Sequence, residues 1–326
     1  MPGPSKLDFE EHLELKKIGE DVFTNVHQPW VFYITFNVPG PVMMAEAAAA
    51  AYKTVPEGFM LDSLHTQFML GPKADKPLVY KVQRVSQGRR FAVRIIIIEQ
   101  DDKPVVAVTA SFMSGQAWTG QAMKHAAAIQ IKERIDKITL DDFVHMRTER
   151  GPFMEFQRLP LQHSNPQDPS TTIAPVVAKI EPPIKSPTGS AAHLLAIVHM
   201  SDYHVMDCPL SIHGVEFGLS KINDYERKQV PYKMKIMTSL NHTIHFHIHD
   251  GFRADDLLYV EATSPWAKDG RGMIHTKIYT KDGLLVATCV QEVRVIHDNE
   301  VQLRFLEVLT IENRLFMFSK TYQSFD

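Results

Sequence analysis

The chain has 326 residues, of which 44% are hydrophobic and 22% are charged, and its formal net charge is -3. That length suits two domains of ordinary size or one duplicated unit, and the composition is that of a soluble protein with full cores. There is no basic block, so neither nucleic-acid nor membrane-surface binding is indicated. Cys208 and Cys289 are the only cysteines, too few for a disulfide framework, so we expect a reducing, intracellular compartment.

Targeting segments are not indicated. Residues 1–6 (Met-Pro-Gly-Pro-Ser-Lys) lead into no apolar run of the secretory kind. No apolar run approaches the length needed to cross a bilayer, and residues 94–98 (Arg-Ile-Ile-Ile-Ile) are typical of a buried strand. Residues 323–326 lack a Ser-Lys-Leu peroxisomal address. We therefore expect a cytoplasmic protein without membrane or nucleic-acid partners.

The first half predicts a helix enclosed by antiparallel strands. After one or two edge strands in the first thirty residues, the β-forming segment 30–36 is broken by Pro39, Gly40 and Pro41. Residues 42–53 are dominated by alanine and predict a helix that other elements can approach closely. Four strands follow, at residues 61–70, 78–86, 90–99 and 105–113, and the helical pattern of residues 118–137 ends this half.

The second half repeats this order. Strands are predicted at residues 153–159 and 174–180, a mostly apolar helix at 190–200, and strands at 232–249, 257–262, 271–280 and 284–295. Residues 302–319 are apolar without a clear period, and we assign them no structure. Three segments also match in sequence at an offset of 176 to 180 residues, for example Leu-Val-Tyr at 78–80 and Leu-Leu-Tyr at 257–259. These matches indicate duplication of one α+β unit.

The longest alternating stretch lies in residues 237–252. Its period of two places Leu240 and His242 on an apolar face with Ile244, and Ser239, Asn241 and three further histidines on a polar face. A polar face of Asn, Thr and His, in place of Lys and Glu, indicates side chains that make directed hydrogen bonds.

These segments resemble the type II acyl-CoA thioesterases. The matching motifs are Ser-Leu-Asn-His at 239–242, Phe-Arg-Ala-Asp at 252–255, Ser-Pro-Trp-Ala at 264–267, Asp-Gly at 282–283 and Val-Gln-Glu at 290–292. Weaker matches continue through the first half, in Ser-Leu-His at 63–65 and Lys-Pro-Leu-Val-Tyr at 76–80, so the resemblance covers nearly the whole chain. It implies an α+β double hotdog, in which two antiparallel sheets each wrap round a central helix. The expected units are residues 1–140 and 141–326.

The resemblance also implies hydrolysis of an acyl thioester to an acid and CoA, without a cofactor. The family holds its water with an Asp, a Ser or Thr, and a Gln. Carried over by motif, the Gln is Gln291, and the hydroxyl is Ser264 or its neighbour Thr263. The Asp position is occupied by Asn241, whose neutral amide cannot serve as a general base.

Two functions therefore remain open. Either hydrolysis continues with another base, such as His242, Glu46 or a second carboxylate, or the pocket binds or transforms an acyl, polyketide or other hydrophobic substrate without hydrolysis. The expected partner is an acyl-CoA or a similar substrate, and a homo-oligomer is compatible with the sequence. We interpret an isolated helical glutamate such as Glu46 as a solvated or interface residue, and a lone His242 as a core histidine.

Two further groups of reactive side chains have simpler interpretations. His245, His247 and His249 share a strand face, but side chains nearly 7 Å apart are too widely spaced for three ligands of one metal, so we assign them hydrogen-bonding roles and expect no metal. Cys289 shares a strand face with Gln291, and we interpret it as a buried structural cysteine.

Overall fold

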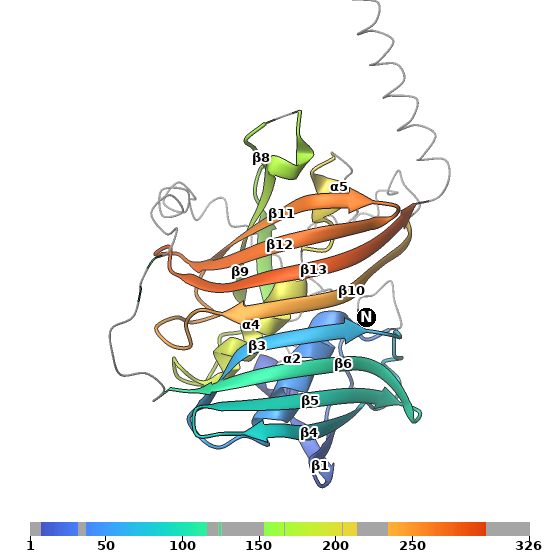
Figure 1. Ribbon diagram of the computed structural model, residues 1–326, viewed down its shortest axis with the longest axis vertical. Coiled ribbons are helices and arrows are strands. Elements are labelled where there is room, and N and C mark those ends of the chain that lie inside the picture. The colour runs from blue at the N-terminus through green and yellow to red at the C-terminus, as the bar shows by residue number, and fades with distance from the viewer. Residues whose placement is uncertain are drawn as a thin grey trace, which may run out of the picture.

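The computed structural model describes residues 8–31, 37–115, 123, 125, 153–165, 167–203, 205–213 and 234–297. Within these residues, thirteen strands form one curved antiparallel sheet, and two central helices lie against its concave face (Figure 1). The boundary predicted at residue 140 lies outside the described residues and stays a prediction. The same is true of the helix predicted at 118–137, apart from two single positions, and of residues 302–319.

The first central helix, α2 (Gly40–Tyr52), begins where the prolines break the preceding chain. Pro41 occupies its first turn, where a missing N–H costs nothing, and the N-cap residue Pro39 offers no side-chain cap. Eleven of its thirteen residues are buried, including every alanine. The helix is therefore enclosed on all sides, as the alanine-rich segment predicts.

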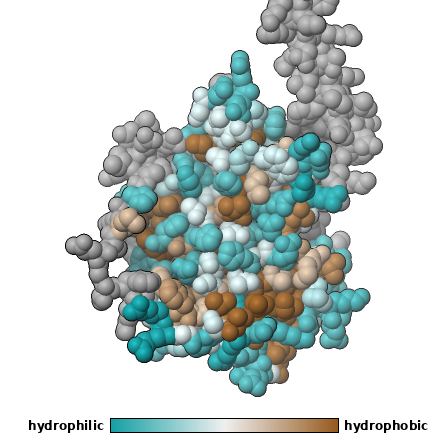
Figure 2. Space-filling model, viewed as in Figure 1, coloured by the Kyte–Doolittle hydropathy of each residue, from teal (hydrophilic) through white to brown (hydrophobic). Residues whose placement is uncertain are grey.

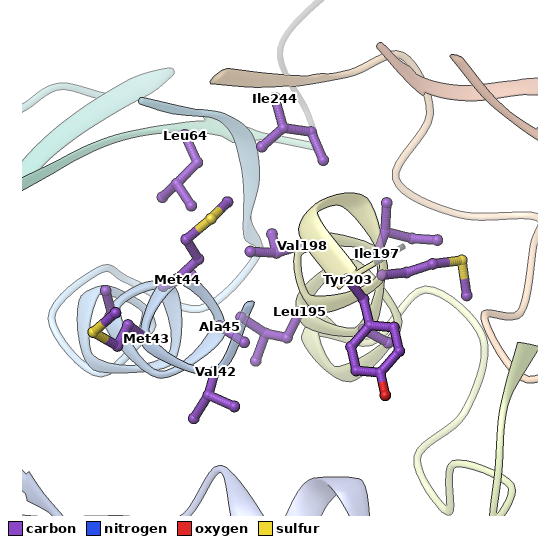
Figure 3. Packing of buried hydrophobic residues seen from close by; sticks show 14 of the residues in the cluster. Val42, Met43, Met44, Ala45, Leu64, Leu195, Ile197, Val198, Tyr203 and Ile244 are labelled. Carbon is purple, nitrogen blue, oxygen red and sulfur yellow. The ribbon is translucent and has the colours of Figure 1, made fainter. Parts of the chain in front are cut away.

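The second central helix, α4 (Ala191–Tyr203), packs directly against α2. In Figure 3, Ala45 and Met44 of α2 lie on the side of the helix that faces Leu195 and Val198 of α4. Leu64 and Ile244 lie above this contact, where they come from the two strands that join the halves, and both are fully buried. One continuous core thus runs through both halves.

Each half supplies four long strands in the same spatial order. In the first half these are β3 (Phe59–Phe68), β4 (Val79–Gln87), β5 (Phe91–Gln100) and β6 (Lys103–Ser114). In the second half they are β10 (Met234–Phe246), β11 (Leu258–Lys268), β12 (Arg271–Thr280) and β13 (Leu285–His297). The order is β4-β5-β6-β3 in one half and β10-β13-β12-β11 in the other, so β3 and β10 join the two sheets edge to edge. The predicted duplication and double hotdog are confirmed.

Shorter elements complete both ends of the sheet. Strands β1 (Leu15–Gly19) and β2 (Val22–Asn25) extend the first half beyond β4. Strands β9 (Thr172–Ile180), β7 (Met154–Arg158) and β8 (Gln162–His163) extend the second half beyond β11. The short helices are α1 (Phe9–His12), α5 (Cys208–Ser211) and the 3-10 turn η2 (Pro169–Thr171). No helix of the described residues is long and apolar enough to cross a membrane.

The duplication extends to irregularities of the strands. The pairing of β3 with β6 slips between Leu61 and Ser63, and that of β10 with β13 slips between Ser239 and Asn241, 178 residues later. Such a β-bulge inserts one residue into one strand and changes the face on which its neighbours lie. The strict alternation predicted for residues 239–249 is therefore wrong at its start: Ser239 is buried on the inner face with His242, and Asn241 lies on the outer face.

The strand predicted at 257–262 continues six residues further than expected, to Lys268. Pro265 is tolerated within it because it falls at a register shift between Thr263 and Trp266, where no ladder hydrogen bond is required of it.

The outer face of the sheet is mostly polar, with apolar side chains gathered over the first-half strands (Figure 2). Among the latter, Val85 is 50% exposed and Phe91 is 44% exposed. This face lies opposite the two central helices (Figure 1).

Candidate active site

A cavity of about 300 Å³ lies where the two halves meet. Its walls come from the start of α2, the end of β3, the last turn of α4 with the segment that follows, and the start of β10. The lining side chains are mostly apolar, and the methionines and Phe68 are the largest of them. The residues that line it are Asn37, Val38, Pro39, Gly40, Pro41, Met43, Phe68, Met69, Leu70, Gly71, Asp202, Met206, Met237, Thr238, Ser239 and Leu240.

The polar end of the cavity is built by Asp202 and Ser239, with Gln291 behind them. Ser239 Oγ donates to Asp202 Oδ1 at 3.0 Å. Gln291 Nε2 donates to Ser239 Oγ at 2.7 Å and also to Asp202 Oδ1. The three side chains come from β10, β13 and the last turn of α4, and each is at least 93% buried. They form one hydrogen-bonded cluster on the wall of a mostly apolar cavity.

Burial dominates the electrostatics of this cluster. It raises the pKa of Asp202 to about 7, against the lowering effect of the hydrogen bonds from Ser239 and Gln291. At neutral pH, Asp202 is therefore divided between its acid and its carboxylate form. A carboxyl group whose pKa lies near the working pH is typical of proton-transfer sites.

The start of α2 lies against this carboxyl group. A Cβ atom built on Gly40 would collide with Asp202 Oδ2 and would lie 3.1 Å from the ring of Phe68. Glycine at this position therefore allows the backbone of α2 and the Asp202 carboxyl group to approach closely. The first N–H groups of a helix have no partner within the helix and carry partial positive charge, so an anion or a carbonyl oxygen is favoured here.

The structure does not bring Asn241 to this cluster. Asn241 Nδ2 donates to Glu292 Oε2 at 3.1 Å, and Glu292 Oε1 accepts from Arg271 Nη1 at 3.0 Å. Arg271 is exposed, so this chain of contacts runs along the outer face of the sheet. Gln291 and Glu292 are consecutive residues of one strand and point to opposite faces. The expected convergence of Asn241 and Gln291 on one pocket is not found, because Asn241 lies on the outer face of the sheet and Gln291 on the inner face; the bulge at Leu240 brings Ser239 to the inner face instead.

The two predicted hydroxyl groups also lie apart from Gln291. Ser264 is buried and donates to the backbone oxygen of Trp266 at 3.4 Å, and Thr263 Oγ1 lies 3.5 Å from the backbone oxygen of His275. Both belong to β11, and β12 separates that strand from β13. Two strand spacings amount to about 10 Å, too far for a direct hydrogen bond. The hydroxyl group that contacts Gln291 is that of Ser239.

The alternative bases are buried away from the cavity wall. His242 is fully buried, its Nε2 lies 2.7 Å from Ser201 Oγ, and burial lowers its pKa to about 4. Glu46 is also fully buried, which corrects its interpretation as a solvated or interface residue. It accepts a hydrogen bond from Tyr80, and burial raises its pKa to about 8. His242 therefore occupies the core position interpreted for it, and Glu46 belongs to the interior of the first half.

The remaining reactive groups lie elsewhere. His247 Nε2 lies 3.0 Å from Thr288 Oγ1, and His65 Nδ1 lies 3.2 Å from Thr243 Oγ1, both on the outer face of the sheet. In the part of the chain that the structure describes, no group of three His, Cys, Asp or Glu residues is arranged to hold a metal. Cys289 is buried, and burial raises the pKa of its thiol.

Two members of the cluster, Asp202 and Ser239, were not among the predicted site residues. A signal for Asp202 exists in the sequence: it is the only charged residue in a helical segment that is otherwise almost entirely apolar (Ala191–Tyr203). A charge in so apolar a helix requires a specific partner or a function. Ser239 carried no such signal, since its orientation depends on the bulge.

Comparisons with known proteins agree with this fold. The family model of the acyl-CoA thioesterase N-terminal domain matches residues 29–113, and that of the C-terminal domain matches residues 146–295. The chain is 27% identical to acyl-coenzyme A thioesterase 8 of Mus musculus, over 86% of each chain. It is 22% identical to acyl-CoA thioesterase 2 of Haemophilus influenzae, over 86% of this chain and 94% of that one.

A solved structure shows the same architecture. The crystal structure of acyl-CoA thioesterase II TesB2 from Mycobacterium marinum superposes with a TM-score of 0.66 at 23% identity, over 90% of this chain and all of that one. Both halves of the duplicated fold are thus matched in sequence, in order and in three dimensions. The chain belongs to the acyl-CoA thioesterase family.

Proposed function

We propose that this protein hydrolyses acyl-CoA thioesters in the cavity between its two halves. One observation carries the proposal: the start of α2 and the Asp202–Ser239–Gln291 cluster meet at one end of an apolar cavity. Hydrolysis of a thioester needs a site for the acyl chain, a donor for the carbonyl oxygen and a group that activates water. The cavity offers all three. The relatives named as thioesterases support the same function.

The carbonyl oxygen of the thioester is placed at the start of α2. Gly40 lines the cavity and is the first residue of the helix, so its N–H has no acceptor within the helix. Pro39 caps the helix without a side-chain hydrogen bond, which leaves this end open to a ligand. An N–H and a helix dipole aimed at the carbonyl oxygen stabilise the negative charge that develops there during attack by water.

The acyl chain occupies the apolar part of the cavity. Met43, Phe68, Met206 and Met237 line it, and methionine side chains adapt to ligands of different shape. A volume of about 300 Å³ lies at the lower end of the range for small-molecule sites. The size favours short and medium acyl chains over long ones, with the CoA part left outside the cavity.

The test is a measurement of CoA release from acyl-CoAs of increasing chain length. We expect turnover with a maximum at short to medium chains. Met237→Trp, which fills the cavity from β10, should lower kcat/KM most for the longest substrates. Met113→Trp is the matched control: Met113 is also half-buried on a strand but does not line the cavity. A wild-type protein without CoA release from any of these substrates would refute the function, and equal effects of both variants would refute the place of the acyl chain.

A further inference from the structure

The Ser239 hydroxyl group has two acceptors and a single proton. Its Oγ lies 3.0 Å from Asp202 Oδ1 and 3.0 Å from the thioether sulfur of Met206, while Gln291 Nε2 donates to it at 2.7 Å. A hydroxyl group has one proton to donate and a thioether is a weak acceptor, so in the unmodified protein Ser239 donates to the carboxylate. The orientation of Ser239 therefore depends on the sulfur of Met206 remaining the weaker acceptor.

Met206 connects this hydrogen bond to the cavity. It is half-buried, lines the cavity and packs against the core on its other side. Met43, Met69 and Met237 also line the cavity, but within the described residues Met206 is the methionine whose sulfur contacts Ser239. A small oxidant that enters the cavity therefore reaches this sulfur while the protein stays folded.

Resting on the proposed hydrolysis, we propose that Met206 is an oxidation site, at which a hydroperoxide forms the sulfoxide and lowers the thioesterase activity. Two observations carry this proposal: Met206 lines the cavity, and its sulfur contacts the hydroxyl group of Ser239. Sulfoxide reductases convert methionine sulfoxide back to methionine, so the loss of activity is reversible.

The reaction balances with a hydroperoxide as the oxidant. A lone pair of the Met206 sulfur attacks the terminal oxygen of the peroxide, the O–O bond breaks, and a proton transfer completes an alcohol or, from hydrogen peroxide, water. The sulfur loses two electrons to the peroxide and keeps the oxygen as a sulfoxide. Reduction of the sulfoxide consumes two thiols, which become a disulfide, and releases the oxygen as water.

The sulfoxide changes both polarity and shape beside Ser239. Its oxygen is a stronger acceptor than a thioether sulfur, so it competes with Asp202 Oδ1 for the one proton of the hydroxyl group. The added oxygen must also be accommodated where the sulfur and the hydroxyl group are already 3.0 Å apart. Because loss of a hydrogen bond to a charged group lowers a rate by about 10- to 100-fold, we expect a fall of about that size in kcat/KM.

Other sulfur atoms do not explain such a loss. Cys208 and Cys289 are both buried, and burial raises the pKa of each thiol, so neither forms a reactive thiolate at neutral pH. Met69 is 45% exposed and lines the same cavity, so the oxidant reaches it more easily than Met206. No contact of the Met69 side chain with the Ser239 cluster is found among the described residues, which makes Met69 the matched control.

The test is treatment with hydrogen peroxide, followed by CoA release from a medium-chain acyl-CoA and by peptide mass spectrometry. We expect the wild type to lose activity in proportion to the sulfoxide at Met206, and to regain it with a methionine sulfoxide reductase and a dithiol but not with the dithiol alone. Met206→Leu, which nearly conserves volume, should keep most of its own untreated kcat/KM under this treatment. Met69→Leu should lose the same fraction as the wild type.

The results distinguish the oxidation site from the function. An active wild type, together with a Met206→Leu variant that loses activity as fast as the wild type, would overturn the role of Met206 and leave the proposed hydrolysis standing. Two results on the wild type alone would do the same: full activity with Met206 oxidised, or loss of activity while Met206 stays unoxidised. An untreated wild type without CoA release would remove the function and this inference with it.

Discussion

Gly40→Ala tests whether the close approach of α2 to Asp202 is needed for activity. The added Cβ would collide with Asp202 Oδ2 and crowd the ring of Phe68 at 3.1 Å. Either the helix start or the Asp202 carboxyl group must move by on the order of 1 Å to reach ordinary contact, and a misplacement of that size costs about 10²-fold in rate. The same crowding should destabilise the fold by about 1–3 kcal/mol.

The assay is CoA release from a medium-chain acyl-CoA, combined with urea unfolding. Gly115→Ala is the matched control, because Gly115 is exposed and a Cβ there meets no atom within 4 Å. We expect Gly40→Ala to lower kcat/KM by about 10²-fold and Gly115→Ala to leave it unchanged. A Gly40→Ala variant with wild-type rate and stability would show that this contact is not kept in solution, and the proposed geometry would be refuted.

Three further predictions concern the cavity and the buried titratable groups. Phe68→Ala enlarges the cavity and should shift the ratio of kcat/KM for longer over shorter acyl chains upward by about tenfold or more; an unchanged ratio in the chain-length series would contradict the place of the acyl chain. Glu46 has a pKa of about 8 when folded and an ordinary value when unfolded, so the folded state binds more protons between these values and stability falls as pH rises through that window. The stability of Glu46→Gln relative to the wild type should therefore be higher at pH 9 than at pH 5, which thermal unfolding at both pH values checks. The same stability difference at both pH values would count against the buried Glu46–Tyr80 pair. His199 has a pKa lowered to about 3, so the unfolded state binds more protons below its ordinary value and the wild type loses stability as pH falls from about 6.5. His199→Phe loses the hydrogen bond to the Pro41 backbone and should be less stable than the wild type at pH 7.5 by about 1 kcal/mol. Melting curves at pH 4.5 should show a smaller or reversed stability difference; a larger loss of stability at pH 4.5 would contradict the lowered pKa of His199.

The fold could be predicted from the sequence because the patterns that indicate it are local and occur in both halves. An alanine run behind Pro41 predicts a helix that must be enclosed, and the observed α2 begins within two residues of the expected start. The eight long strands follow alternating patterns that occur twice in the same order. When the same unit appears twice, each half supports the assignment of the other.

The geometry of the site was harder to predict from the sequence, because it depends on a single irregularity of a strand. A bulge at Leu240 leaves the alternating pattern nearly intact yet turns Ser239 to the inner face, while Asn241, which strict alternation places on the same face as Ser239, stays on the outer face. The motif assigned Asn241 to the site, and it lies on the correct strand, β10, but on the outer face of the sheet, away from the cluster. Gln291, in contrast, lies on a regular stretch of β13, and its inward orientation could be predicted.

The buried charges show a second limit. Glu46 was interpreted as a solvated or interface residue because a lone glutamate on a helix is usually exposed. Its partner, Tyr80, is 34 residues away and lies on a strand, so the pairing is visible only in three dimensions. Asp202 illustrates the same point, since it lies on helix α4 and both of its donors come from strands β10 and β13.

The central claim is that a water molecule at the Asp202–Ser239–Gln291 cluster attacks the acyl carbon directly. A single turnover in ¹⁸O-labelled water, with enzyme in excess over a medium-chain acyl-CoA, tests it most directly. The account predicts one ¹⁸O atom in each molecule of free acid and none in the Asp202 peptide by mass spectrometry. Unlabelled acid together with ¹⁸O in that peptide would show that Asp202 attacks as a nucleophile through an anhydride, and would contradict the account.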